Sequence, residues 1–146
     1  MAKVSFDASM RVVALIGDDA FLSPYYTRQL IDALEQAHGE IERFDFDGDA
    51  ASPADVLDEL RTFGLLQQHK IVIVDKADRF LAARGEGSGP SRARVLLEKY
   101  VAAPCEDATL LLRADTWHRG KIDKAIEKVG LVHRIKSLGP ADTLRW

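Results

Sequence analysis

The sequence has little cysteine and no long apolar run. Cys105 is the single cysteine of the 146 residues, and one cysteine cannot close a disulfide within the chain, which suits a reducing compartment. No apolar stretch approaches the roughly 20 residues that a membrane-spanning helix needs. The first ten residues, MAKVSFDASM, lack the apolar centre of a signal peptide. These absences predict a cytoplasmic protein without a membrane partner.

An excess of basic residues is also absent. The chain has 20 Lys and Arg against 23 Asp and Glu, which gives a net charge of −3, so no overall basic field attracts nucleic acid. A nucleic-acid-binding domain with a local basic patch stays an alternative. Its candidate residues are Arg92, Arg94, Lys99, Arg113, Arg119 and Lys121. Their positions fit the solvated faces of helices better than a DNA-binding surface.

Apolar β-branched runs alternate along the chain with segments of helical periodicity. Buried strands are predicted at 12–16, 70–75 and 109–114, and more exposed strands at 41–46 and 131–138, where polar and apolar residues alternate. Helices are predicted at 20–38, 52–63, 91–103 and 120–130. This order predicts one α/β domain, a three-layer parallel sheet with helices on both faces.

The first predicted strand, Gly17 and the helix after it follow one another as in a phosphate-binding loop. Such a loop needs a lysine for the phosphates and a hydroxyl group for Mg²⁺. Here the turn carries Asp18 and Asp19, which would repel a triphosphate. Asp75 stands at the end of a later strand, where an Mg²⁺-binding aspartate is found in such enzymes, but Lys76 follows in place of a catalytic glutamate. We therefore expect no catalysis and no cofactor, and a nucleotide-binding or ATPase domain stays the alternative.

Three aspartates resemble the beginning of a calcium-binding loop. Asp45, Asp47 and Asp49 alternate as such ligands do, but the glycine comes fourth rather than sixth, and Val56 stands where a bidentate glutamate is required. Ser52 instead predicts a turn that ends in a helix N-cap. The stretch therefore predicts no metal site.

The four histidines also predict no metal site. His38, His69, His118 and His133 are scattered without ligand spacing or a nearby pair of cysteines. We expect all four to lie on the solvated surface.

An apolar group follows the helix predicted at 52–63. Phe63, Leu65 and Leu66, here called the apolar triplet, lie just before a strand, in a segment that also carries glycine and glutamine. On one interpretation the triplet closes the core between helix and strand. On the other it is exposed, and an exposed apolar group usually marks a binding site for a partner.

Several stretches match one family in order and spacing. They are GDDAFL (17–22), FDFDGDAASPADVLDELRTFGLLQQHKIVIVDKADRFL (44–81), LEKYVAAP (97–104), ATLLLRADTW (108–117) and KIDKAIEKVG (121–130). Together they resemble the first domain of the delta subunit of bacterial DNA polymerase III, a subunit of the sliding-clamp loader. The resemblance runs from about residue 12 to residue 138.

The resemblance implies an AAA+/P-loop NTPase-like domain that lacks a functional Walker A motif and does not bind ATP. It implies a non-catalytic role in DNA replication: binding of the sliding clamp (the beta ring) and help in opening it, alongside other clamp-loader subunits, with DNA met indirectly through the complex. The family's clamp-binding leucine–phenylalanine pair falls on Leu65 and Leu66, with Phe63 two residues upstream, so Leu66 replaces the usual aromatic residue. On this reading the first domain spans 1–138, and 139–146 begins the connection to a further domain.

Overall fold

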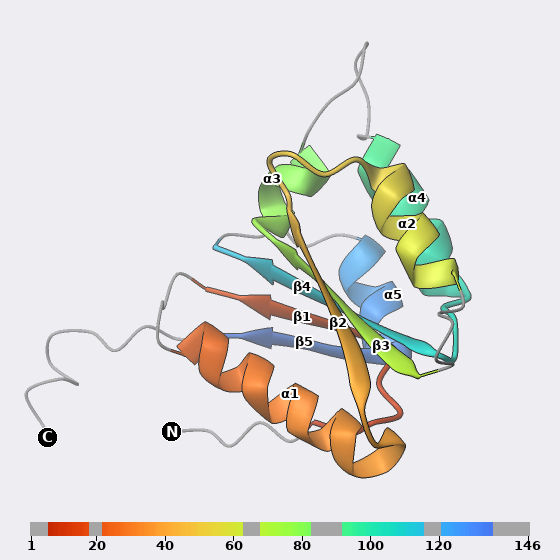
Figure 1. Cartoon of the computed structure of the whole chain (residues 1–146). Helices are drawn as coiled ribbons and strands as arrows, with labels where there is room; N and C mark the ends of the chain where they lie inside the picture. Colours follow the sequence, from red (N-terminus) through yellow and green to blue (C-terminus); the bar gives the residue numbers. More distant parts are fainter. Residues whose placement is uncertain (1–5, 18–21, 63–67, 83–91, 116–120, 136–146) are drawn as a thin grey trace, which may run out of the picture.

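The computed structural model describes residues 6–17, 22–62, 68–82, 92–115 and 121–135 of the chain. The helices and strands among them are β1 (Val12–Ile16), α1 (Leu22–His38), β2 (Ile41–Asp47), α2 (Pro53–Arg61), β3 (His69–Asp75), α3 (Ala77–Ala82), α4 (Arg92–Ala102), β4 (Ala108–Ala114), α5 (Lys121–Val129) and β5 (Gly130–Arg134). Figure 1 shows one twisted sheet with helices on both sides.

The sheet is parallel throughout, in the order β2-β3-β4-β1-β5. After β1 the chain crosses to the far edge at β2 and then returns through β3 and β4 to β5. Because such crossovers are right-handed, the outward and the return paths place their helices on opposite faces. Accordingly α1 covers one face, and the other four helices cover the opposite one (Figure 1). The predicted three-layer α/β fold is confirmed.

Each face of the sheet has its own apolar core. On one face, Leu30 of α1 packs in a cluster with Leu15 and Ile73. On the other, Val72 belongs to a larger cluster that includes Leu97 of α4. The central strands β1, β3 and β4 are therefore buried on both faces, which explains their nearly continuous apolar sequences. The edge strand β2 alternates between half-buried and exposed residues instead.

The predicted start of α2 is confirmed. Ser52 is the N-cap, and its side-chain oxygen accepts a hydrogen bond from the Asp55 N–H at 3.2 Å. Pro53 follows as the first helical residue, where its missing N–H costs little. The turn before this helix is therefore explained by helix capping, as predicted.

One helix is not predicted by the sequence, and one prediction about a histidine is wrong. The helix is α3, whose six residues are too few to display a period of 3.6, although its Ala77 and Phe80 are buried. His69 does not lie on the solvated surface: it is 7% exposed, at the start of β3. His38, which is exposed, stacks on it with ring centroids 4.1 Å apart, so a neighbouring side chain covers the ring that the sequence assigned to solvent.

The strand predicted at 131–138 is found as β5, with Ile135 buried just after it; residues 136–138, like the expected connection at 139–146, lie outside the described residues. Within the described part of the chain, no helix has the length and apolar character to span a membrane.

Candidate functional site

The carboxyl ends of the central strands surround a cavity of about 570 Å³. Its lining includes Gly17 after β1, Asp47 and Asp75 at the ends of β2 and β3, and Arg113 near the end of β4. The helix after β1 lies on one face of the sheet and the helix after β4 lies on the other. This is the topological switch point, where open α/β sheets bind their ligands. We call it the switch-point cavity.

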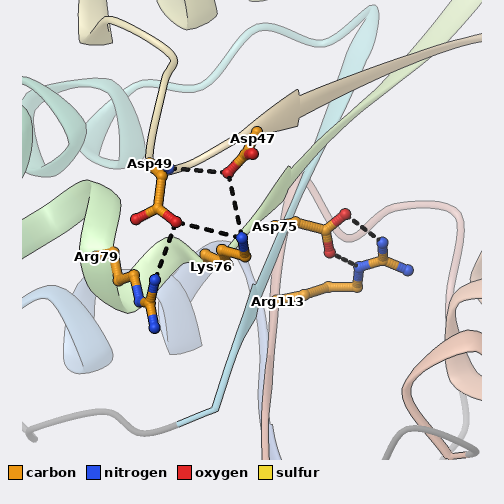
Figure 2. Close-up of polar contacts among 6 residues, drawn as sticks. All are labelled: Asp47, Asp49, Asp75, Lys76, Arg79 and Arg113. Carbon is orange, nitrogen blue, oxygen red and sulfur yellow. Dashed lines mark hydrogen bonds and ion pairs between the residues drawn. The ribbon is translucent and has the colours of Figure 1, made fainter.

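An ion pair occupies the wall of this cavity. The Arg113 Nε and Nη2 atoms each donate to a different carboxylate oxygen of Asp75, both at 2.6 Å. The Arg113 Nη1 atom also donates to the Thr27 hydroxyl of α1, at 3.3 Å. Figure 2 shows the two side chains meeting head to head. Asp75, which stands at the position of an Mg²⁺-binding aspartate, is therefore engaged by a guanidinium group.

A second set of charges lies beside the first but is more exposed. The Asp49 carboxylate contacts Lys76 Nζ at 3.2 Å and Arg79 Nη1 at 3.0 Å, and Asp47 lies 4.0 Å from the same lysine (Figure 2). The hydrogen bond from Lys76 is the largest cause that lowers the pKa of Asp49 below its ordinary value. All four side chains are at least 40% exposed, so water and salt screen these contacts. They connect the turn after β2 with the beginning of α3.

The glycine of that turn is explained by close backbone packing. The Gly48 N–H donates to the Asp75 carbonyl at 2.7 Å, and a Cβ atom at Gly48 would lie 2.3 Å from the Lys76 carbonyl oxygen. Lys76 itself has a left-handed backbone, with φ 52°. The glycine of the FDGD sequence at 46–49 therefore allows the turn after β2 to pack closely against the turn after β3.

The glycine after β1 has a similar explanation. Gly17 has φ 151°, and a Cβ atom there would lie 2.7 Å from the Ile135 carbonyl oxygen. Its N–H donates to the Ala114 carbonyl at 2.8 Å. Packing between neighbouring strand ends therefore accounts for a glycine that the sequence linked to a phosphate loop. Asp18 and Asp19 lie outside the described residues.

The apolar triplet also lies outside the described residues, but both ends of its segment are described. Thr62 caps the carboxyl end of α2, and Gln68 precedes β3. Because β3 begins there, the segment attaches at the amino edge of the sheet, opposite the switch-point cavity. The described residues include no group of three or more His, Cys, Asp or Glu side chains that could hold a metal ion.

Two functional candidates escaped the sequence analysis. Arg113 was considered only for DNA binding, but its guanidinium is committed to Asp75. Lys70 is the first residue of the buried strand predicted at 70–75, and the structure shows it 3% exposed and bonded to the end of α2. The signal was the same for both: a basic residue inside or beside an apolar strand must find partners when the strand is buried.

The chain is similar to known proteins in both sequence and structure. Residues 14–138 match the model of the family described as DNA polymerase III, delta subunit. Among solved structures, the DNA clamp loader delta protein of Bacillus subtilis has a TM-score of 0.64 and 21% identity over 92% of this chain and 41% of that one. A DNA polymerase III gamma subunit-related protein from Thermotoga maritima has a TM-score of 0.53 and 16% identity over 88% of this chain and 42% of that one. No curated protein sequence matches.

Fold and cavity together define a three-layer α/β domain of the kind found in these clamp-loader structures, with the Asp75–Arg113 ion pair in the wall of its switch-point cavity. The family match covers most of the chain, and the chain belongs to the delta subunit family of the DNA polymerase III clamp loader. It spans less than half of the length of the two solved structures that it resembles.

Proposed function

We propose that this chain is a non-catalytic clamp-loader module that binds the sliding clamp and helps to open the ring during DNA replication. The clamp contact is proposed for the apolar triplet, Phe63, Leu65 and Leu66. Within a longer protein, the module would work beside other clamp-loader subunits and meet DNA indirectly. Family membership supports this role.

The observation that carries the non-catalytic part is the ion pair in the switch-point cavity. A nucleotide bound there would need its phosphates and Mg²⁺ neutralised by free lysine, hydroxyl and carboxylate groups. Asp75 is instead bonded twice to Arg113. Asp45, Asp47 and Asp115 add three further carboxylates to the lining, and these disfavour a triphosphate.

The clamp contact is supported by the order of the family motifs and by the place of the triplet between α2 and β3. Two leucines and a phenylalanine in one short segment are suited to insertion into an apolar pocket of a partner. Each buried anchor of this kind typically contributes about 1–3 kcal/mol to binding. Separation from the switch-point cavity would let this contact operate without any nucleotide.

The test is a paired measurement of clamp binding and thermal unfolding for Leu65→Ala and Leu66→Ala. If the triplet is a binding site, each change should weaken binding to the cognate clamp by about 1–3 kcal/mol and alter stability by about 0.5 kcal/mol or less. Tyr25→Ala is the matched control, because Tyr25 is a large exposed apolar residue (47%) on α1. It should change clamp binding little.

The opposite pattern would reject the proposal. If the triplet fills the core, each leucine truncation should cost about 2–5 kcal/mol of stability. A double mutant that melts far below wild type, while its folded fraction still binds the clamp normally, would remove the triplet from the interface.

A further inference from the structure

Lys70, the second residue of β3, is a buried lysine whose ammonium group is fully bonded. Its side chain is 4% exposed. The Nζ atom donates to the Glu59 carbonyl at 2.8 Å, to the Thr62 carbonyl at 2.6 Å and to the Glu59 carboxylate at 3.0 Å. An ammonium group has three N–H donors, so all three have an acceptor. Burial of a charge is costly unless it is satisfied in this way.

The acceptors of Lys70 lie at the carboxyl end of α2. The last carbonyl groups of a helix have no partner within the helix and carry partial negative charge. The Thr62 N–H, by contrast, closes the helix by donating to the Asp58 carbonyl. Lys70 therefore supplies from the sheet the donors that this end of α2 lacks. The bond to the Thr62 carbonyl involves the peptide group that leads directly into the apolar triplet.

The other end of the triplet segment is also fixed by polar contacts. The Gln68 side chain donates to the Glu40 carboxylate at 3.3 Å, and the His69 Nε2 atom lies 2.8 Å from the Thr109 hydroxyl oxygen. Lys70 follows immediately in the same strand. It is thus the side chain that joins the two described ends of the segment directly.

Packing beside these ends is incomplete. A cavity of about 240 Å³ opens beside them, lined by Thr62, Gln68 and Lys70 together with Cys105. Where neighbouring atoms are absent on one side, van der Waals contact fixes a backbone less firmly. The Lys70 bond to the Thr62 carbonyl therefore adds a direct polar link between Thr62 and β3 to the apolar packing of α2.

We infer that Lys70 is a positioning residue for clamp binding: its bonds to the end of α2 fix the two chain ends between which Phe63, Leu65 and Leu66 lie. The inference rests on the proposed function. A segment whose ends are held before binding loses less conformational freedom when its partner arrives, and this raises affinity without a new contact. Lys70 need not touch the clamp.

The test compares three variants of the 146-residue chain for binding to the cognate sliding clamp by surface plasmon resonance. Lys70→Met keeps the aliphatic length and removes all donors, and we expect its Kd to rise about tenfold. Lys70→Arg keeps the charge and several donors, and should recover to within about threefold of wild type. Lys76→Met is the matched control: the same change at the opposite end of β3, where the lysine is 49% exposed, should leave Kd unchanged.

Hydrogen exchange separates positioning from general stability. In Lys70→Met, the described amides at the two ends of the segment, 60–62 and 68–69, should exchange at least tenfold faster than in wild type, while those of β1 and β4 keep their rates. Wild-type affinity of Lys70→Met, or equal acceleration across the whole sheet, would overturn the inference and leave the proposed function standing. Absence of clamp binding by the wild type would overturn both. If neither Lys70 variant folds, the lysine is a folding residue and the positioning role is rejected.

Discussion

The ion pair of the switch-point cavity should be asymmetric in its contribution to stability. Arg113 is 18% exposed at its side chain and Asp75 is 43% exposed. Asp75→Asn removes the negative charge and one of its two acceptor oxygens, and leaves a mostly buried guanidinium charge with only neutral acceptors among its described partners. Arg113→Met leaves a carboxylate that water can reach, and supplies apolar atoms where the arginine stem packed. Removing the aspartate charge should therefore cost more than removing the arginine.

The size of each effect follows from this exposure. A hydrogen bond to a charged group contributes about 1.5–3 kcal/mol, and exposed ion pairs contribute about 0–1 kcal/mol. The first range applies to the loss of the partner of the mostly buried Arg113, and the second to the loss of the partner of Asp75, which is more than one-third exposed. We expect Asp75→Asn to lower the free energy of unfolding by about 1.5–2.5 kcal/mol, and Arg113→Met by about 0.5–1 kcal/mol. The double variant should cost little more than Arg113→Met alone, since the buried charge is then absent.

Urea unfolding measures these differences as shifts of the midpoint at a constant m value. Asp49→Asn is the matched control: Asp49 also bonds two basic groups (Figure 2), but in a solvated setting, so its midpoint should not move measurably. Greater loss in Arg113→Met than in Asp75→Asn would refute the argument from burial. So would wild-type stability of both single variants.

Three further outcomes are expected. Calorimetry should detect no saturable binding of Mg-ATP at millimolar concentration, because Asp75 is held by Arg113; a clear micromolar isotherm would restore the ATPase alternative. Gly48→Ala should destabilise the fold by at least about 2 kcal/mol, because the added Cβ would lie 2.3 Å from a backbone oxygen. In the control, Gly39→Ala, nothing lies within 4 Å of the added Cβ, so only the positive φ should cost stability, by about 1–2 kcal/mol. Equal losses of stability in thermal unfolding would contradict this prediction. Burial, together with the neighbouring His38 and Arg11, lowers the pKa of His69 from 6.5 to about 4. As pH drops from about 6.5 to about 4, the imidazole is protonated in the unfolded chain before it is protonated in the folded protein, so the free energy of unfolding should fall. His69→Gln should remove this part of the pH dependence of stability, and an unchanged slope of stability against pH would refute the assignment.

The central strands could be predicted because they are buried on both faces and therefore consist of nearly continuous apolar residues. β1 is found at the predicted residues, 12–16, since five consecutive apolar residues bounded by a charged residue and a glycine have few other readings. The order of the strands was not predictable from local pattern. It depends on which strand β1 pairs with, and both β4 and β5 pair with it across long stretches of sequence.

The ion pair could not be predicted for a related reason. Asp75 and Arg113 lie one position beyond the pairing of Val74 with Leu112, so their contact depends on the register between β3 and β4. A strand buried on both faces gives no alternation that would show where each side chain points. The same ambiguity hid Lys70, which shares the face of Val72 and Val74 and therefore meets α2, whereas His69 faces α1 with Ile71 and Ile73.

Backbone packing accounts for the phosphate-loop-like glycines at the carboxyl ends of the strands without requiring a bound nucleotide. Gly17 and Gly48 are required by close backbone approach between neighbouring turns, so the glycine pattern at the carboxyl edge is maintained by packing even when no nucleotide binds. The charged groups there form ion pairs with one another, Lys76 with Asp49 and Arg113 with Asp75. The proposed clamp contact belongs to the segment that leads into the other end of β3, away from these charges. A variant at one edge should accordingly leave the measured property of the other unchanged: Asp75→Asn should bind the clamp as wild type does at a temperature where it is folded, and loss of clamp binding in that variant would show that the two edges are coupled.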